Sequence, residues 1–211
     1  MEAYPSYATV KKASIKKVIN NITLRDWLEI DINKNASRIL LYVLMNPSKA
    51  NKVRCDKTVK KVLDFTRSQT SLLDSLVPDV KTVIIVNLFP FYKTDSSKLY
   101  ELLNELCETR SGYEDLLEAN LLKIRRGIQK ADYIVYGWGD PPDNVDEWYH
   151  RELTSRILIT AKRFGKENTF VFKSTRDEII TQKRNPRHPI IITLTGLKRC
   201  KMQPFYTVSL N

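Results

Sequence analysis

The sequence has few of the residues that build metal centres and disulfide frameworks. It contains two histidines, His150 and His188, and three cysteines, Cys55, Cys107 and Cys200, which stand far apart with no Cys-x-x-Cys pair. An odd number of scattered cysteines argues against a secreted, disulfide-stabilised fold, so we expect reduced thiols. Two histidines without paired cysteines make a poor set of metal ligands, and we expect no metal and no other cofactor.

Glycine is also scarce, and this limits the kinds of active site. With six glycines the chain shows no phosphate-cradling glycine loop, and no Ser-His-Asp set is apparent. The apolar runs fall short of a membrane span, and the start, "MEAYPSYATVKK", lacks a signal-peptide core. These absences predict a cytoplasmic protein that does not associate with membranes.

What the chain does have is positive charge, and the charge is unevenly distributed. The 211 residues carry 35 Lys and Arg against 24 Asp and Glu, a formal net charge of +11. Basic residues are concentrated in residues 1–60 and 173–201, whereas most of the acidic residues lie between these segments. A basic face that attracts a polyanion such as nucleic acid would form if the two segments meet in space.

The order of expected elements indicates the fold class. Apolar, β-branched runs at 38–45, 81–89, 132–139 and 168–173 predict buried strands, and helical periodicity predicts helices over 57–69, 96–108, 113–131 and 146–164. This alternation predicts an α/β fold, a three-layer sandwich with a mostly parallel central sheet of about four strands. We expect one domain, 1–211, and a monomer, with a helical N-terminal extension over 1–35 and a core over 38–195.

The first three expected strands end in proline-containing loops, and the last basic segment carries a fourth proline motif. The quoted stretches are "LMNPSKA", "IVNLF", "YGWG" and "RNPRHP". Proline stiffens a loop because it fixes one backbone dihedral, and ligand sites of parallel sheets gather at the carboxyl ends of the strands. We therefore predict a pre-formed pocket at that edge.

These four motifs, in this order, resemble an uncharacterised bacterial family often carried on mobile elements, and more remotely the uracil-DNA glycosylase superfamily. The resemblance covers about residues 38–195 and implies a uracil-DNA glycosylase-like fold with a pocket for a base flipped out of DNA. It implies that Asn46 holds the attacking water and that His188 stabilises the departing base anion. One departure is that "IIIT" replaces the serine-proline expected after His-Pro.

The resemblance also implies a set of binding residues. Asn87 would read the edge of the base, with stacking faces from aromatic side chains, and basic loops would contact DNA. The implied base-binding residues are Asn87, Phe89, Phe91, Tyr92 and Trp138, and the implied DNA-binding residues are Ser48, Lys49, Lys52, Arg54, Arg184 and Arg187.

Each of these residues also has a plainer interpretation. Asn46 before proline can shape a turn, Asn87 can cap neighbouring backbone groups, and Trp138 can be a packed lid. His188 can be a surface residue of a basic loop. Asp56 is expected to be a helix N-cap, and Asp140 either activates water or turns the chain before Pro-Pro.

Three functions remain open from the sequence. The first is a DNA-binding, glycosylase-like protein whose base excision is slow or lost, because an amide cannot accept a proton at neutral pH. The second is a non-catalytic relative that binds DNA or acts as a decoy for an acidic, DNA-mimicking uracil-DNA glycosylase inhibitor. The third is an enzyme acting on a free nucleotide or modified nucleoside.

Overall fold

A computed structural model describes residues 1–18, 22–92, 99–108, 113–142, 145–175, 179–202 and 208–210. The elements in chain order are β1 (Glu2–Ala3), β2 (Thr9–Lys17), β3 (Thr23–Asp31), β4 (Arg38–Leu44), β5 (Arg54–Cys55), α1 (Lys57–Thr70), β6 (Val80–Asn87), α2 (Leu99–Glu108), α3 (Tyr113–Lys130), β7 (Tyr133–Gly137), α4 (Glu147–Arg163), β8 (Thr169–Ser174), the 3-10 helix η3 (Pro189–Ile191), β9 (Leu194–Met202) and β10 (Val208–Leu210).

A central sheet runs through the described part of the chain. Its eight strands there have the order β10-β9-β8-β7-β4-β6-β3-β2. The inner pairs β6–β4, β4–β7 and β7–β8 are parallel, whereas the pairs on both sides of them are antiparallel. The four predicted strands are the parallel centre. The prediction of about four strands, mostly parallel, was wrong for the whole sheet, because antiparallel strands extend it at both edges.

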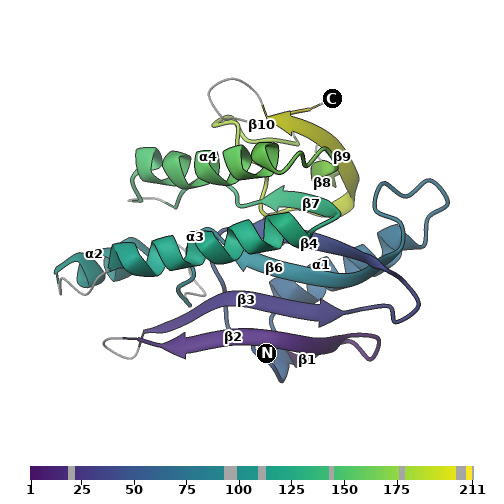
Figure 1. Cartoon of the computed structure of the whole chain (residues 1–211), viewed down its shortest axis with the longest axis horizontal. Coiled ribbons are helices and arrows are strands. Elements are labelled where there is room, and N and C mark those ends of the chain that lie inside the picture. The colour runs from purple at the N-terminus through teal and green to yellow at the C-terminus, as the bar shows by residue number, and fades with distance from the viewer. Residues whose placement is uncertain are drawn as a thin grey trace.

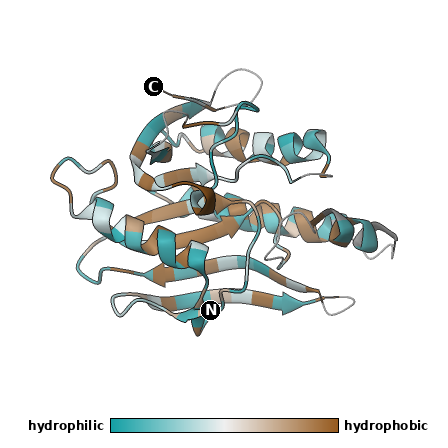
Figure 2. Ribbon diagram, turned by 180° about the vertical axis from the view of Figure 1, so that it is seen from behind, coloured by the Kyte–Doolittle hydropathy of each residue, from teal (hydrophilic) through white to brown (hydrophobic). Residues whose placement is uncertain are grey.

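Helices pack on both faces of this sheet. Along β4, Leu40 and Tyr42 face the side covered by α1, and Leu41 and Val43 face the side covered by α2, α3 and α4. Figure 1 shows α3 and α4 in front of the sheet, and Figure 2, seen from behind, shows α1 over the opposite face. The central strands are largely hydrophobic in Figure 2, as expected for strands buried on both faces.

The helical N-terminal extension predicted over residues 1–35 was wrong. Residues 9–17 form β2 and residues 23–31 form β3, an antiparallel pair that joins the sheet through β6. β2 is an edge strand, and its lysines lie on the solvent side, where they protect the edge from pairing with another chain. The spacing of these lysines would also suit the polar face of a helix. The segment is a strand because it pairs with β3.

The four helices predicted after residue 56 agree with the structure in type and position. α1, α3 and α4 begin and end within one or two residues of their predicted bounds. The first residues of the helix predicted over 96–108 lie outside the described residues, and α2 is described from Leu99 onward.

Candidate functional site at the carboxyl edge of the sheet

A cavity of about 620 Å³ lies at the edge where β4 and β7 end. We call it the sheet-edge cavity. Four segments line it, namely the N-terminal residue, the loop after β4 with the start of α1, the loop after β7, and the segment that precedes and includes η3. The lining residues are Met1, Met45, Asn46, Ser48, Lys49, Asp56, Lys57, Thr58, Trp138, Gly139, Asp140, Thr181, Arg187, His188, Ile190 and Ile191.

The loop after β4 is held by its own polar side chains. Asn51 Oδ1 accepts hydrogen bonds from the backbone N–H groups of Val53 (2.8 Å) and Arg54 (2.9 Å), which closes a turn. Asp56 is the N-cap of α1, as predicted, because its Oδ1 accepts from Val59 N–H at 2.8 Å. Its Oδ2 accepts from Ala50 N–H at 3.1 Å, so the same carboxylate joins the loop to the helix.

A buried arginine beneath this loop has no counterpart in the sequence-based predictions. Arg25 on β3 is 2% exposed. Its guanidinium donates to Ala50 O at 3.0 Å and to Asn87 Oδ1 at 3.5 Å, and it lies 5.9 Å from the centre of the Tyr92 ring. Burial lowers the pKa of Arg25, and nearby Asp56 opposes that shift. Arg25 therefore fixes the loop against the end of β6.

His188 is a neutral hydrogen-bonding group at the cavity wall. Its Nδ1 accepts from Ile190 N–H at 3.4 Å, which places the ring proton on Nε2. Burial lowers the pKa of His188 to about 4, an effect that Lys61 reinforces and Asp56 opposes. At neutral pH the imidazole can therefore donate one hydrogen bond without carrying a charge.

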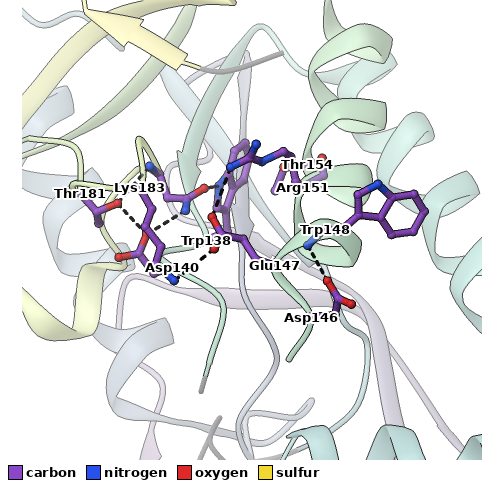
Figure 3. A network of polar contacts seen from close by, with 10 residues as sticks. Trp138, Asp140, Asp146, Glu147, Trp148, Arg151, Thr154, Thr181 and Lys183 are labelled. Carbon is purple, nitrogen blue, oxygen red and sulfur yellow. Dashed lines mark hydrogen bonds and ion pairs between the residues drawn. The ribbon is translucent and has the colours of Figure 1, made fainter. Parts of the chain in front are cut away.

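The loop after β7 is tied to the segment before η3. Gly139 N–H donates to Pro186 O at 2.8 Å, and Trp138 Nε1 donates to Asn185 Oδ1 at 3.4 Å. Asp140 Oδ1 accepts from Thr181 Oγ1 at 2.6 Å and from Asn185 Nδ2 at 2.8 Å, as Figure 3 shows for the first of these contacts. Asp140 thus holds two loops together, which fits its turn-forming role better than activation of water.

Gly139 is required where it stands. Its φ is +77°, a conformation that favours glycine, and a Cβ added there would lie 3.2 Å from His188 Cβ. A side chain at position 139 would therefore press against His188.

The structure brings together about half of the predicted site residues. Lining the sheet-edge cavity are Asn46, Ser48, Lys49, Trp138, Arg187 and His188. The two basic segments of the sequence therefore do meet, because Lys49 and Lys57 come from the first and Arg187 from the second. Trp138 is 1% exposed, so it forms part of the wall rather than an open stacking face.

The other predicted base-binding residues lie beneath the cavity or beside it. Phe89 and Phe91 are 0% exposed and Asn87 is 1% exposed, so none of them lines the cavity. The Asn87 carboxamide accepts from Arg25, and its backbone oxygen accepts from Asn120 Nδ2 at 2.9 Å. The Asn87 side chain therefore holds Arg25, and the side chain that caps the backbone at this strand end is Asn120. Tyr92 is partly buried and donates its hydroxyl to Ala50 O at 2.5 Å.

The remaining predicted DNA-binding residues lie outside the cavity. Lys52 and Arg54 are exposed on the turn after Asn51. Arg184, with a φ of +62°, lines a second hollow behind Trp138. Conversely, Lys57, Ile190 and Ile191 line the cavity and were missed by the sequence analysis. Pro189 was the sequence feature that could have indicated the two isoleucines. It is the first residue of η3, the short helix on which both isoleucines are exposed.

Comparisons with known proteins give one finding. The family described as "Protein of unknown function (DUF1643)" matches residues 23–190, a span that includes β3 and so begins earlier than the predicted core at residue 38. Searches of curated proteins and of solved structures find no match to the chain. In the described residues every helix is too short or too polar for a membrane span. The matched span covers most of the sequence, and the chain therefore belongs to the DUF1643 family, the kind of uncharacterised family that its motifs predict.

Proposed function

We propose that the protein binds DNA and receives a single flipped nucleotide in the sheet-edge cavity. The observation that carries this proposal is that Asn46 and His188, 142 positions apart in the sequence, line one cavity of about 620 Å³. A volume of this size is within the usual range for small-molecule sites. The order of strand-end motifs that resembles uracil-DNA glycosylases supports the same conclusion.

The rim of the cavity has the chemistry that a flipped nucleotide needs. Lys49, Lys57 and Arg187 line it and supply positive charge for the flanking phosphates. Ile190 and Ile191 are 43% and 60% exposed at the same rim. Exposed apolar side chains beside a pocket can fill the gap that a flipped base leaves in the stack.

Hydrolysis of the N-glycosidic bond would use the two polar side chains in different ways. Positive charge develops on the sugar and negative charge on the departing base, and the neutral His188 Nε2–H can donate to the base. Asn46 can orient a water molecule but cannot take its proton. The expected base excision is therefore slow.

The state of the carboxylates favours a second candidate, a non-catalytic DNA-binding protein or decoy. Asp56 and Asp140 line the cavity, but each accepts two hydrogen bonds from neighbouring loops or the start of α1. Carboxylates used in this way are poor general bases. An acidic, DNA-mimicking glycosylase inhibitor would bind such a protein through the same three cations.

The position of α1 favours the third candidate, a protein that acts on a free nucleotide or modified nucleoside. Lys57 and Thr58 form the first turn of α1 and line the cavity, and first-turn N–H groups have no acceptor within their own helix. They could bind one phosphate group. A single phosphate would give a shallow salt dependence, whereas a strand adds about −0.7 to the logarithmic slope for each contacted phosphate.

One set of assays separates the three candidates. Abasic-site formation is measured on single- and double-stranded DNA that contains uracil or a mismatch, together with the salt dependence of binding to an oligonucleotide and to a mononucleotide. We expect slow excision that Asn46→Ala and His188→Ala abolish, and that Asn35→Ala, an exposed control near the amino end of β4, leaves unchanged. Binding without any abasic product would support the decoy, and preferential binding of the mononucleotide would contradict the DNA proposal.

A further inference from the structure

A second, smaller hollow lies on the other side of Trp138. Its volume is about 170 Å³, and Trp138 is the wall that it shares with the sheet-edge cavity. We call it the His150 hollow. Its lining residues are Trp138, Glu147, His150, Arg151, Thr154, Leu158, Lys183, Arg184, Asn185 and Val208. A hollow of this size is too small for a nucleotide and suits a single small group.

His150 is the feature of this hollow that indicates a ligand. The residue lies on α4 and is 2% exposed, yet its Nε2 is buried without a hydrogen-bond partner among the described residues. Buried polar atoms almost always have a partner, so an orphan atom in the wall of a hollow indicates that a ligand or water completes the site. Burial also lowers the pKa of His150 to about 4, which keeps the ring neutral.

The charges around His150 decide which kind of ligand fits. Three cationic side chains, from Arg151, Lys183 and Arg184, line the hollow together with one carboxylate, from Glu147. Glu147 accepts from Arg151 at 3.2 Å and from Lys183 at 3.4 Å, as the close-up in Figure 3 shows, so a single anion is shared between two cations. Asp140 also lies close enough to raise the pKa of His150 against the effect of burial, which leaves three cations against two carboxylates. This surplus of positive charge favours an anion and disfavours a metal ion.

The uncharged polar side chains of the hollow, Thr154 and Asn185, are also compatible with an anion as the ligand. Thr154 donates its hydroxyl to Arg151 O at 3.0 Å, and Asn185 donates its amide to Asp140. The Thr154 hydroxyl proton and one of the two Asn185 amide protons are therefore already used, and the donors that remain for a ligand belong to His150, the three cations and the second Asn185 amide N–H. Donors that approach from several directions match the tetrahedral oxygens of a phosphate, because a phosphate accepts more bonds than a carboxylate does.

We propose that the His150 hollow binds one phosphate group, held by His150 in the tautomer that carries its ring proton on Nε2 and by Arg151, Lys183 and Arg184. The argument for a phosphate in this hollow uses only the contacts of its own residues. One further step rests on the proposed function, namely that this phosphate belongs to the DNA strand whose base enters the sheet-edge cavity. In that case Trp138 separates the base from the neighbouring phosphate, and the link from Trp138 to Asn185 holds the two sites at a fixed spacing.

The chain offers a direct test, because it has two histidines and each lines one of the two hollows. With ¹⁵N-labelled histidine, the imidazole nitrogens of His150 and His188 can be followed separately by NMR. Inorganic phosphate is added at pH 7, with sodium chloride at matched ionic strength as the control, and a single-stranded oligonucleotide is added in a separate titration. We expect phosphate, but not chloride, to shift His150 Nε2, and the oligonucleotide to shift both histidines.

Variants test the cations without disturbing the core. The Lys183 side chain is 51% exposed, so Lys183→Ala should fold, and we expect it to weaken phosphate binding about fivefold to tenfold. Lys162→Ala, an exposed control near the other end of α4, should leave binding unchanged.

The outcomes separate this site from the proposed function. If phosphate shifts His150 but the oligonucleotide binds nowhere, the hollow takes a phosphate from a small molecule and the DNA proposal fails alone. If the oligonucleotide shifts His188 while neither ligand moves His150, the His150 site is refuted and the DNA proposal stands. Equal shifts with chloride, or an unchanged affinity in Lys183→Ala, would also refute the site.

Discussion

At the scale of single residues, the chemistry of the cavity depends on two neutral groups, a carboxamide and an imidazole. Asn46 can hold a water molecule or a base edge but cannot deprotonate water at neutral pH. His188 donates through Nε2 because Ile190 N–H occupies Nδ1, and its lowered pKa keeps it uncharged. Neutral donors of this kind recognise polar ligands without the cost of burying a charge.

The sequence could predict that Asn46 and His188 lie at the cavity, but it could not predict that Asn87 lies beneath it. Asn46 and His188 stand next to prolines at strand and loop ends, and this is visible in the sequence. Asn87 also ends a strand, yet it points to Arg25, which lies 62 positions earlier on β3. The direction of the Asn87 side chain depends on that distant partner, and nothing near Asn87 in the sequence reveals it.

Arg25 gives the first prediction. Replacing it in Arg25→Met leaves Asn87 Oδ1 without its donor and Ala50 O with the Tyr92 hydroxyl alone. We expect the free energy of unfolding to fall by about 1–3 kcal/mol, measured by urea denaturation. Arg38→Met, in which a side chain 55% exposed is replaced, should have a much smaller effect. Equal losses in both variants would contradict the role given to Arg25.

At the scale of elements, the sequence predicted the centre of the fold better than its edges. Strands β4, β6, β7 and β8 are near-continuous apolar runs, a pattern typical of strands buried on both faces. β3 was missed because charged Arg25 and Asp26 interrupt it, although both are buried. In β9 the buried Leu197 and Cys200 are three residues apart, which hides the two-residue period of a strand.

The second prediction concerns the packing of the loop after β7 against His188. Gly139 lies in this loop, and Gly165, which also has a positive φ, serves as its control. Gly139 and Gly165 have φ of +77° and +62°, so alanine at either position should cost about 1–2 kcal/mol of stability. A Cβ at Gly139 meets His188, whereas a Cβ at Gly165 meets no atom within 4 Å. Gly139→Ala should therefore also shift the His188 imidazole resonances and weaken oligonucleotide binding. Indistinguishable variants would contradict the close packing of the two loops.

At the scale of the whole molecule, the fold brings together basic residues that are far apart in the sequence. The two basic segments of the sequence converge on one edge of the sheet, because the loop after β4 and the segment leading to η3 flank the same cavity. Lys61 Nζ donates to Ile192 O at 2.6 Å and joins α1 to that segment. Composition predicted an attraction to polyanions, but only the fold shows that Lys49, Lys57 and Arg187 line one cavity.

The third prediction concerns stability and pH. His150 and His188 each have a pKa of about 4 in the folded protein, below the usual value of 6.5, mainly because of burial. The unfolded chain binds protons more readily between these values, so the stability contribution is fully present above pH 6.5 and is lost as the pH falls towards 4. For His150 alone we expect the free energy of unfolding to be about 2 kcal/mol lower at pH 5 than at pH 7.

Urea denaturation at both pH values, for wild type and His150→Gln, measures this effect. The pH dependence should be smaller in the variant, because one of the two buried imidazoles is gone. Greater stability at pH 5 than at pH 7, or an identical pH dependence in the variant, would show that His150 is not held in its neutral form.

The proposed function requires that Asn46 and His188 contact the same ligand. A double-mutant cycle with Asn46→Ala, His188→Ala and the double variant tests it, using fluorescence anisotropy of duplex DNA that carries one unpaired uracil. We predict that each single variant weakens binding, and that the double variant departs from additivity by about 0.5–3 kcal/mol because the two residues share one binding site. Strictly additive effects, or single variants that bind as tightly as Asn35→Ala does, would contradict the account.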